Sequence, residues 1–291
     1  MKNQTFGIEI EMTGIARRDA ANVVANHFGS IVDYRGGSYD LRIVRDDQGR
    51  EWKVMRDASI NAPEDKKCEF VSPICRWEDI ELIQTLVRKL RKVGAKPDPS
   101  CGIHVHIGRG QHTPATLRNL MNMMSAKEDL IAQALKIEPS RLGRWCKKVD
   151  QYTLREVNAQ RPATDDDFAK VWYGTRSDAA VERCKATHYH DSRYHMLNLH
   201  SVFQKGTVEF RMFNSTMHAG EIRADIQFAM AISHAALAAK TASPKKPTTD
   251  NPKYALRCWL LKLGFIGDEF KTARLHLTSA LEGNSAWRHG A

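Results

Sequence analysis

The sequence predicts an α+β fold in which a curved, mostly antiparallel sheet has a polar concave face and carries helices on its other face. Short segments alternate apolar and polar residues with the period of two that is typical of strands. Segments with helical spacing lie between them, and turn residues such as those at 46–49 (DDQG) separate neighbouring strands. The 291 residues are 42% hydrophobic, which is enough for one full core, so we expect a single domain over residues 1–291.

Strand periodicity is clearest near the amino terminus, where Phe6, Ile8, Ile10 and Met12 alternate with polar residues. A hairpin is expected around residues 46–49, and a second around Gln204-Lys205-Gly206. In chain order, the predicted strands are residues 6–12, 39–44, 52–55, 68–72, 102–107, 194–203 and 207–213.

Helical spacing marks further segments, of which residues 77–93 are the clearest because they begin acidic, end basic and place apolar residues on one face. Gly29 is expected to end the first helix in a left-handed conformation. The predicted helices are residues 20–28, 77–93, 113–135, 219–240 and 254–263.

Two stretches have no strand or helix pattern. Residues 136–191 are polar and carry no legible motif, so the sequence does not predict their role. Residues 243–252 contain three prolines and are expected to form an exposed loop. This loop separates a motif-bearing core at about 5–235 from a helical extension at about 253–291.

Composition restricts the class of protein. Lys and Arg outnumber Asp and Glu by 44 to 34, which gives a net charge of +10 and a surface that attracts anions, or simply a solvated basic surface. The six cysteines form no CxxC pair, which argues against a zinc ribbon or a disulfide framework. The first twelve residues lack the apolar run of an export signal, and the most apolar stretch, residues 228–239, is shorter than the ~20 residues of a membrane span. We therefore expect a soluble protein of the reducing cytoplasm.

Three predicted strands carry a pair of ionisable residues on the face opposite their apolar residues. These pairs are Glu9 with Glu11, His104 with His106, and Glu209 with Arg211. Carboxylates that share a sheet face repel one another unless cations lie between them. Oxygen ligands with one or two histidines suit Mg²⁺ or Mn²⁺, so we expect a site for such ions, to which Asp57 and Glu69 on neighbouring segments could contribute.

Each pair alone is more often a solvated sheet face than a ligand set. Three such strands in one chain favour a functional site. Arg211 adds a planar donor fork that binds phosphate oxygens.

Five segments follow one another in a characteristic order: GIEIE at 7–11, WKVMRDASI at 52–60, EFVSP at 69–73, CGIHVH at 101–106 and EFR at 209–211. This order resembles that of the amidoligases, which are similar to glutamate-cysteine ligase and glutamine synthetase. The resemblance covers about residues 5–235 and implies a glutamine-synthetase-like fold. It also implies an ATP-dependent ligase that joins a carboxylate to an amine through an acyl phosphate, giving an amide or isopeptide bond, with ATP and two or more Mg²⁺ or Mn²⁺ ions.

The resemblance also implies roles for individual residues. Glu9, His104 and Glu209 match the ligands of the metal that bridges the nucleotide phosphates. The second metal, nearer the acceptor carboxylate, matches Glu11, Glu69 and Asp57. The separation of Asp57 from Glu69 is wider than that of the matching acids in glutamine synthetase, which makes Asp57 the less secure of the three.

The remaining roles concern the nucleotide and the substrates. By the same resemblance, His106 faces the nucleotide and Arg211 the transferred phosphoryl group. Asp57 and Glu69 are candidates for the base that deprotonates the amine. The substrate pocket is expected to include Arg193, Tyr194 and Asn198, which precede the last motif, although a turn-and-strand role fits them equally.

Two other functions remain open from the residues. A metal-dependent phosphoesterase or another phosphotransferase uses the same carboxylates, histidines and cations. A nucleic-acid-binding protein would use the +10 charge, but its basic residues should cluster, and here they are dispersed. The charge also suggests an acidic peptide, an acidic protein or a nucleic acid as the substrate of a ligase.

Overall fold

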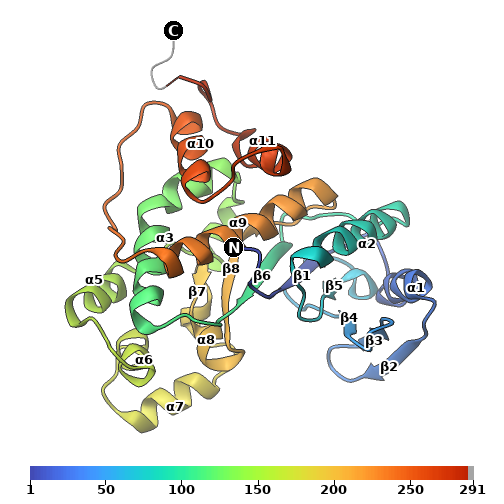
Figure 1. Ribbon diagram of the computed structural model, residues 1–291. Coiled ribbons are helices and arrows are strands. Elements are labelled where there is room, and N and C mark those ends of the chain that lie inside the picture. The colour runs from blue at the N-terminus through green and yellow to red at the C-terminus, as the bar shows by residue number, and fades with distance from the viewer. Residues whose placement is uncertain (288–291) are drawn as a thin grey trace.

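The computed structural model describes residues 1–287 and shows an α+β fold built on one curved, open sheet of eight antiparallel strands (Figure 1). This confirms the predicted class and the antiparallel pairing. Residues 288–291 of the predicted extension lie outside the described residues. The strands are β1 (Phe6–Met12), β2 (Val32–Gly36), β3 (Leu41–Arg45), β4 (Glu51–Met55), β5 (Cys68–Val71), β6 (Gly102–Gly108), β7 (Leu197–Asn198) and β8 (Thr207–Asn214).

The sheet order is β2-β3-β4-β5-β1-β6-β8-β7, so the first strand of the chain lies near the centre. The hairpin predicted at residues 46–49 is confirmed, because β3 and β4 pair with Val44 opposite Trp52. Gly29 ends the first helix in the left-handed conformation, as expected, with φ of 60°. The helices are α1 (Arg17–Phe28), α2 (Ile80–Lys92), α3 (Pro114–Ala134), α4 (Pro139–Arg144), α5 (Gln151–Gln160), α6 (Asp165–Tyr173), α7 (Asp178–Ala186), α8 (His200–Gln204), α9 (Ala219–Ala238), α10 (Pro252–Lys262) and α11 (Lys271–Thr278).

The core lies between the sheet and the helices on one of its faces. Helix α9 contacts β1, β6 and β8 on one side and α2, α3 and α11 on the other (Figure 1). Because it is enclosed in this way, α9 is apolar around most of its circumference, and thirteen of its residues are buried. Apolar strand residues such as Ile8, Ile10 and Val105 are fully buried in this core, which leaves the acids of the same strands on the opposite face.

One predicted strand is wrong. The strand expected over residues 194–203 is only two residues long, because α8 begins at His200. The buried Asn198 side chain accepts a hydrogen bond from the Ser201 amide (3.4 Å), which turns the chain out of the sheet. The His200 imidazole then lies within hydrogen-bonding distance of the Tyr173 hydroxyl (2.6 Å) and the Thr187 carbonyl (3.0 Å), which fixes the helix.

The polar segment 136–191 forms the four short helices α4 to α7, which lie beside the sheet edge at β7 and β8 (Figure 1). Three of them begin at a residue whose side chain accepts a hydrogen bond from the first turn: Asp150, Thr164 and Ser177. Each exposes most of one face, so the segment has little apolar periodicity.

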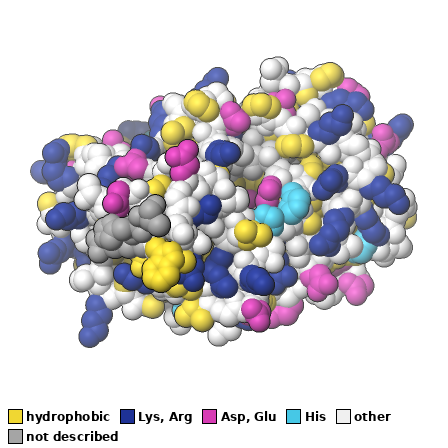
Figure 2. All heavy atoms as spheres, turned by 90° about the horizontal axis from the view of Figure 1, so that it is seen from above, with side chains coloured by type: hydrophobic (Ala, Val, Ile, Leu, Met, Phe, Trp, Pro, Cys, Tyr) yellow, Lys and Arg dark blue, Asp and Glu magenta, His cyan; other side chains and the backbone are white. Residues whose placement is uncertain are grey.

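Lys and Arg side chains are interspersed with Asp and Glu over the face seen in Figure 2. Within residues 1–287, helices that are both long enough and apolar enough to span a membrane are absent.

Candidate active site

The strands that carry the predicted ionisable residues are consecutive neighbours in the sheet, in the order β5-β1-β6-β8. The pairing places the functional residues directly opposite one another. Glu9 lies opposite His104, Glu11 opposite Glu69, and His106 opposite Glu209. One polar patch therefore crosses four strands.

The first cluster on this patch contains Glu9, Glu209 and the two histidines of β6. His104 Nδ1 lies 3.0 Å from a Glu9 carboxylate oxygen and 3.8 Å from one of Glu209. His106 Nε2 lies 3.2 Å from the other Glu9 oxygen and 3.7 Å from Glu209. Four side chains from three strands thus present ligand atoms toward one small volume.

Cationic groups balance the acids of this first cluster. Arg211 donates to Glu209 at 2.5 Å, and both side chains are buried. Burial favours a raised pKa for Glu209, but Arg211, His106 and His104 outweigh it and hold that pKa below its usual range. Burial, with Arg211, lowers the pKa of His104 to about 4, so its imidazole is neutral at pH 7, the form that ligates metals.

His106 has an unused ring nitrogen. Its Nδ1 lies 3.0 Å from the Thr207 hydroxyl. Its Nε2 is buried and, among the described residues, makes no hydrogen bond, although two carboxylates surround it. A buried nitrogen of this kind costs free energy unless something binds it. A cation between this nitrogen and the carboxylates would satisfy it.

The second cluster contains three acids, Glu11, Asp57 and Glu69, each with an oxygen within 4.8 Å of the other two. Burial raises the pKa of Glu11 to about 8, and nearby Asp57 adds to the rise. The pKa of Glu69 is raised well above its usual value, first by burial and then by Glu9, Asp57 and Glu11. Like charges directly opposite on paired strands are destabilising, so this cluster also suits a cation.

The structure thus brings together every acid and histidine that the sequence singles out for metal binding, with Arg211 beside them. Asp57, the least secure from its spacing, lies in the loop after β4 and reaches the second cluster. Glu11 is further fixed by the Gly102 amide, which donates to its carboxylate at 2.6 Å.

The three residues expected to line the substrate pocket lie in different settings. Asn198 is buried and donates to Glu209 at 2.5 Å, so it positions that carboxylate. Tyr194 lies beside the site, with the Arg211 guanidinium 6.0 Å from its ring centroid. The Arg193 guanidinium lies over the rings of Tyr194 and Tyr189 at 5.7 and 5.4 Å. A substrate contact by Arg193 or Tyr194 remains a prediction.

Two basic residues at the site are missed by the sequence reasoning. Lys205 Nζ lies 3.1 Å from Glu9, yet Lys205 belongs to a turn whose pattern indicates only a hairpin. Arg141 is buried and donates to the carbonyl oxygens of Phe213 and Arg211, which holds the end of β8. It comes from the segment 136–191, where nothing in the sequence marks it.

Comparison with known proteins assigns the chain to a family. Residues 2–233 match the model of a family described as "Putative amidoligase enzyme". The match covers most of the chain and all the residues of both clusters, so the protein belongs to the amidoligase family, as its motifs predicted. A search of curated proteins finds no match.

Proposed function

We propose that this protein is an ATP- and Mg²⁺-dependent ligase that forms an amide or isopeptide bond between a carboxylate and an amine. Membership of the amidoligase family supports ligase chemistry in general. The observation that supports the metal and ATP dependence is the pair of adjacent carboxylate clusters, one of which holds Arg211. Two cation sites beside an arginine guanidinium are an arrangement that enzymes use for phosphoryl transfer.

The residues present fit two hard divalent cations. Glu9 and Glu209, with His104 or His106, would hold one ion, and Glu11, Asp57 and Glu69 would hold the other. The buried, unbonded Nε2 of His106 and the opposed carboxylates of Glu11 and Glu69 support this fit. Bound there, such ions would neutralise phosphate charge.

The proposed chemistry has two steps. A carboxylate oxygen of the first substrate attacks the γ-phosphorus of ATP, and ADP leaves. The amine nitrogen of the second substrate then attacks the acyl carbon. The bond between that carbon and the bridging oxygen breaks, and phosphate leaves with this oxygen. Arg211 would donate hydrogen bonds to the phosphoryl oxygens, where the negative charge is spread. The proton lost by the amine goes to a base, for which Asp57 and Glu69 are the candidates.

The test is ATP turnover by the purified chain with a mixture of carboxylates and amines, followed by mass spectrometry of the products. We expect ADP and phosphate to form only when Mg²⁺ or Mn²⁺ is present, together with a product lighter by one water than its two parents. Glu9→Gln and Glu209→Gln should each reduce turnover by about 10²-fold or more.

The matched control is Glu128→Gln, which changes a carboxyl that is also buried but lies outside both clusters. It should leave turnover unchanged. Full turnover by folded Glu9→Gln or Glu209→Gln would refute the assignment. Hydrolysis of phosphate esters without ATP, and without amide formation, would favour the phosphoesterase alternative.

The net charge of +10 supports an acidic peptide, an acidic protein or a nucleic acid as one substrate. Rates on acidic acceptors should then fall as salt rises, while rates on neutral acceptors stay constant. Equal and salt-insensitive rates on both would contradict this choice of substrate.

A further inference from the structure

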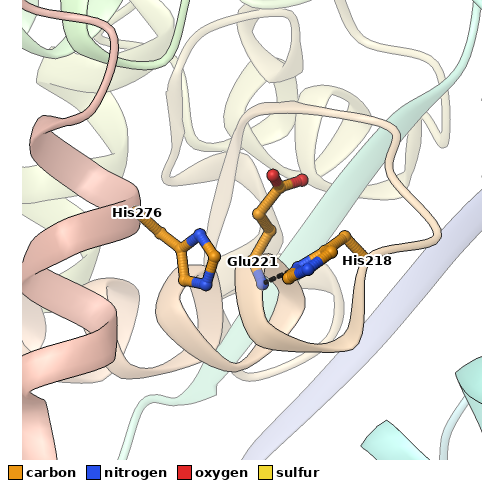
Figure 3. A group of neighbouring side chains, drawn as sticks. All are labelled: His218, Glu221 and His276. Atoms are coloured by element: carbon orange, nitrogen blue, oxygen red, sulfur yellow. Dashed lines mark hydrogen bonds between the residues drawn. The ribbon is translucent and has the colours of Figure 1, made fainter.

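A second group of ligand-type side chains lies away from the acid clusters, where α9 meets α11. His218 and Glu221 come from the beginning of α9, and His276 comes from α11 (Figure 3). One ligand atom of each residue lies within 4.8 Å of the other two. On the face seen in Figure 2, histidine and acidic side chains lie side by side at the surface.

The local structure holds these three residues in place. His218 is the N-cap of α9, and its Nδ1 accepts a long hydrogen bond of 3.3 Å from the Glu221 amide. The Thr216 hydroxyl donates to the Glu221 carboxylate at 2.6 Å. The rings of His218 and His276 are 5.0 Å apart and inclined at 61°.

Gly220 leaves the space that His276 occupies. A Cβ at this position would lie 2.7 Å from His276 Nε2, closer than real Cβ atoms approach, and 3.0 Å from His218 Cε1, which is a tight contact. Any other residue would therefore push the two imidazoles apart. The juxtaposition of the two helices at this point depends on a glycine in the first turn of α9.

Asp225 is a second, independent observation that points to a cation here. It lies one helical turn after Glu221 on the same face of α9, and its side chain is 7% exposed. It lines a cavity of about 290 Å³ together with Glu221 and His276. Within residues 1–287, no hydrogen bond or ion pair of its carboxyl is found. A buried carboxyl without a partner beside a second acid is costly unless a cation or a proton neutralises it.

We propose that His218, Glu221 and His276 bind a divalent transition metal of the zinc type, and that Asp225 faces the same ion from the wall of the cavity. Two imidazoles with one carboxylate suit Zn²⁺, and Ni²⁺ or Cu²⁺ less specifically, whereas Mg²⁺ favours sites in which carboxylate oxygens outnumber the histidines. A metal on Nε2 of His218 places the ring hydrogen on Nδ1, so the long contact with the Glu221 amide is given up on binding.

The proposed ion would join two parts of the chain. His218 and Glu221 lie within the residues that match the family, 2–233, whereas His276 lies beyond them. The metal would therefore fix the carboxyl-terminal helix α11 to the catalytic core. This inference does not depend on the ligase function, because none of the four residues belongs to either acid cluster.

The test is calorimetric titration of the chelator-treated full chain with Zn²⁺. Because the acid clusters are also proposed to bind cations, the titration uses a Glu9→Gln, Glu11→Gln background and saturating Mg²⁺. We expect one Zn²⁺ per chain. His276→Gln and His218→Asn should each weaken its affinity by about 100-fold or more. Asparagine is a good N-cap, so the second variant keeps α9 capped.

The matched control is His234→Ala, which removes an exposed histidine near the other end of the same helix and should bind Zn²⁺ as strongly as the parent. Gly220→Ala should weaken binding because its Cβ displaces His276. In the Glu9→Gln, Glu11→Gln parent, Zn²⁺ should slow hydrogen exchange of the amides in α11. When His276→Gln is added to this parent, Zn²⁺ should not slow that exchange. Equal Zn²⁺ affinity in the parent and in folded His276→Gln and His218→Asn would overturn the proposal, as would an equal loss in His234→Ala.

Discussion

Adding Mg²⁺ or Mn²⁺ to the metal-free protein at pH 7 should release protons, because the Glu11 carboxyl of the second cluster is protonated without a cation. Burial and Asp57 raise the pKa of Glu11 to about 8. The pKa of Glu69, its cross-strand partner, is also raised well above the usual value, by burial and by Glu9. A carboxyl must ionise to bind a metal ion, so an ion that binds in the second cluster displaces the protons that these groups hold.

The size of the effect follows from the pKa of Glu11. A rise from 4.5 to about 8 corresponds to about 5 kcal/mol against ionisation. At pH 7, a group with this pKa is about nine-tenths protonated. Glu11 should therefore release about 0.9 proton, and the raised pKa of Glu69 should add to this number. Between pH 6 and 8, the apparent metal affinity should rise about tenfold per pH unit for each proton released, and it should level off above pH 8 as Glu11 ionises.

The assay is isothermal titration of the metal-free protein with Mn²⁺ in two buffers of different ionisation enthalpy, which gives the number of protons released. Glu11→Gln should reduce that number by about 0.9. Glu128→Gln removes another buried carboxyl with a raised pKa, but one outside the clusters, and should not change it. A release near zero in the parent chain, or an equal release in Glu11→Gln, would show that the second cluster does not take the cation.

Two further predictions concern stability. Burial, helped by Arg109, lowers the pKa of His112 to about 4, so the unfolded chain binds a proton at higher pH than the folded chain does. The free energy of unfolding should therefore fall by about 2 kcal/mol between pH 7 and pH 5. Urea denaturation should show a smaller fall in His112→Asn. Gly102→Ala would place a Cβ 2.2 Å from Arg141 Nη2 and force that buried cation off its carbonyl partners, which should cost about 3 kcal/mol in urea denaturation. Gly143→Ala, whose Cβ meets nothing within 4 Å in helix α4, should instead stabilise the protein slightly, and an equal loss in both glycine variants would contradict the role of Arg141.

The acid face of the sheet could be predicted because a strand fixes which side chains share a face. The alternation in residues 6–12 places Glu9 and Glu11 on one side whatever the strand pairs with. The neighbours of that strand depend on contacts between distant residues, and no local pattern encodes them. The sequence therefore predicts the ligand residues, but not that β5, β1, β6 and β8 lie side by side with Glu11 opposite Glu69.

Asp57 shows the limit of spacing as a guide. Its distance along the chain from Glu69 made its role the least secure, yet the chain between them folds as a loop with a short 3-10 helix, Glu64–Lys66, and brings both acids to one point. Lys205 and Arg141 could not be found at all, because a lysine in a turn and an arginine in a polar segment are ordinary surface residues until the fold places them.

The two acid clusters differ in how their charge is balanced, and this difference determines which cluster releases protons when a metal ion binds. In the first cluster the pKa values of Glu9 and Glu209 lie below the usual range, although both are buried, because His106 acts on Glu9 and Arg211 on Glu209. Both are therefore ionised at pH 7 before any cation arrives, and an ion binding there displaces no proton from them. The pKa values of Glu11 and Glu69 are instead raised, because burial and the neighbouring acids outweigh the positive charges of Arg141, Arg211 and Lys205. Carboxyl protons released on metal binding thus come from the second cluster, whose metal the family resemblance places nearer the acceptor carboxylate.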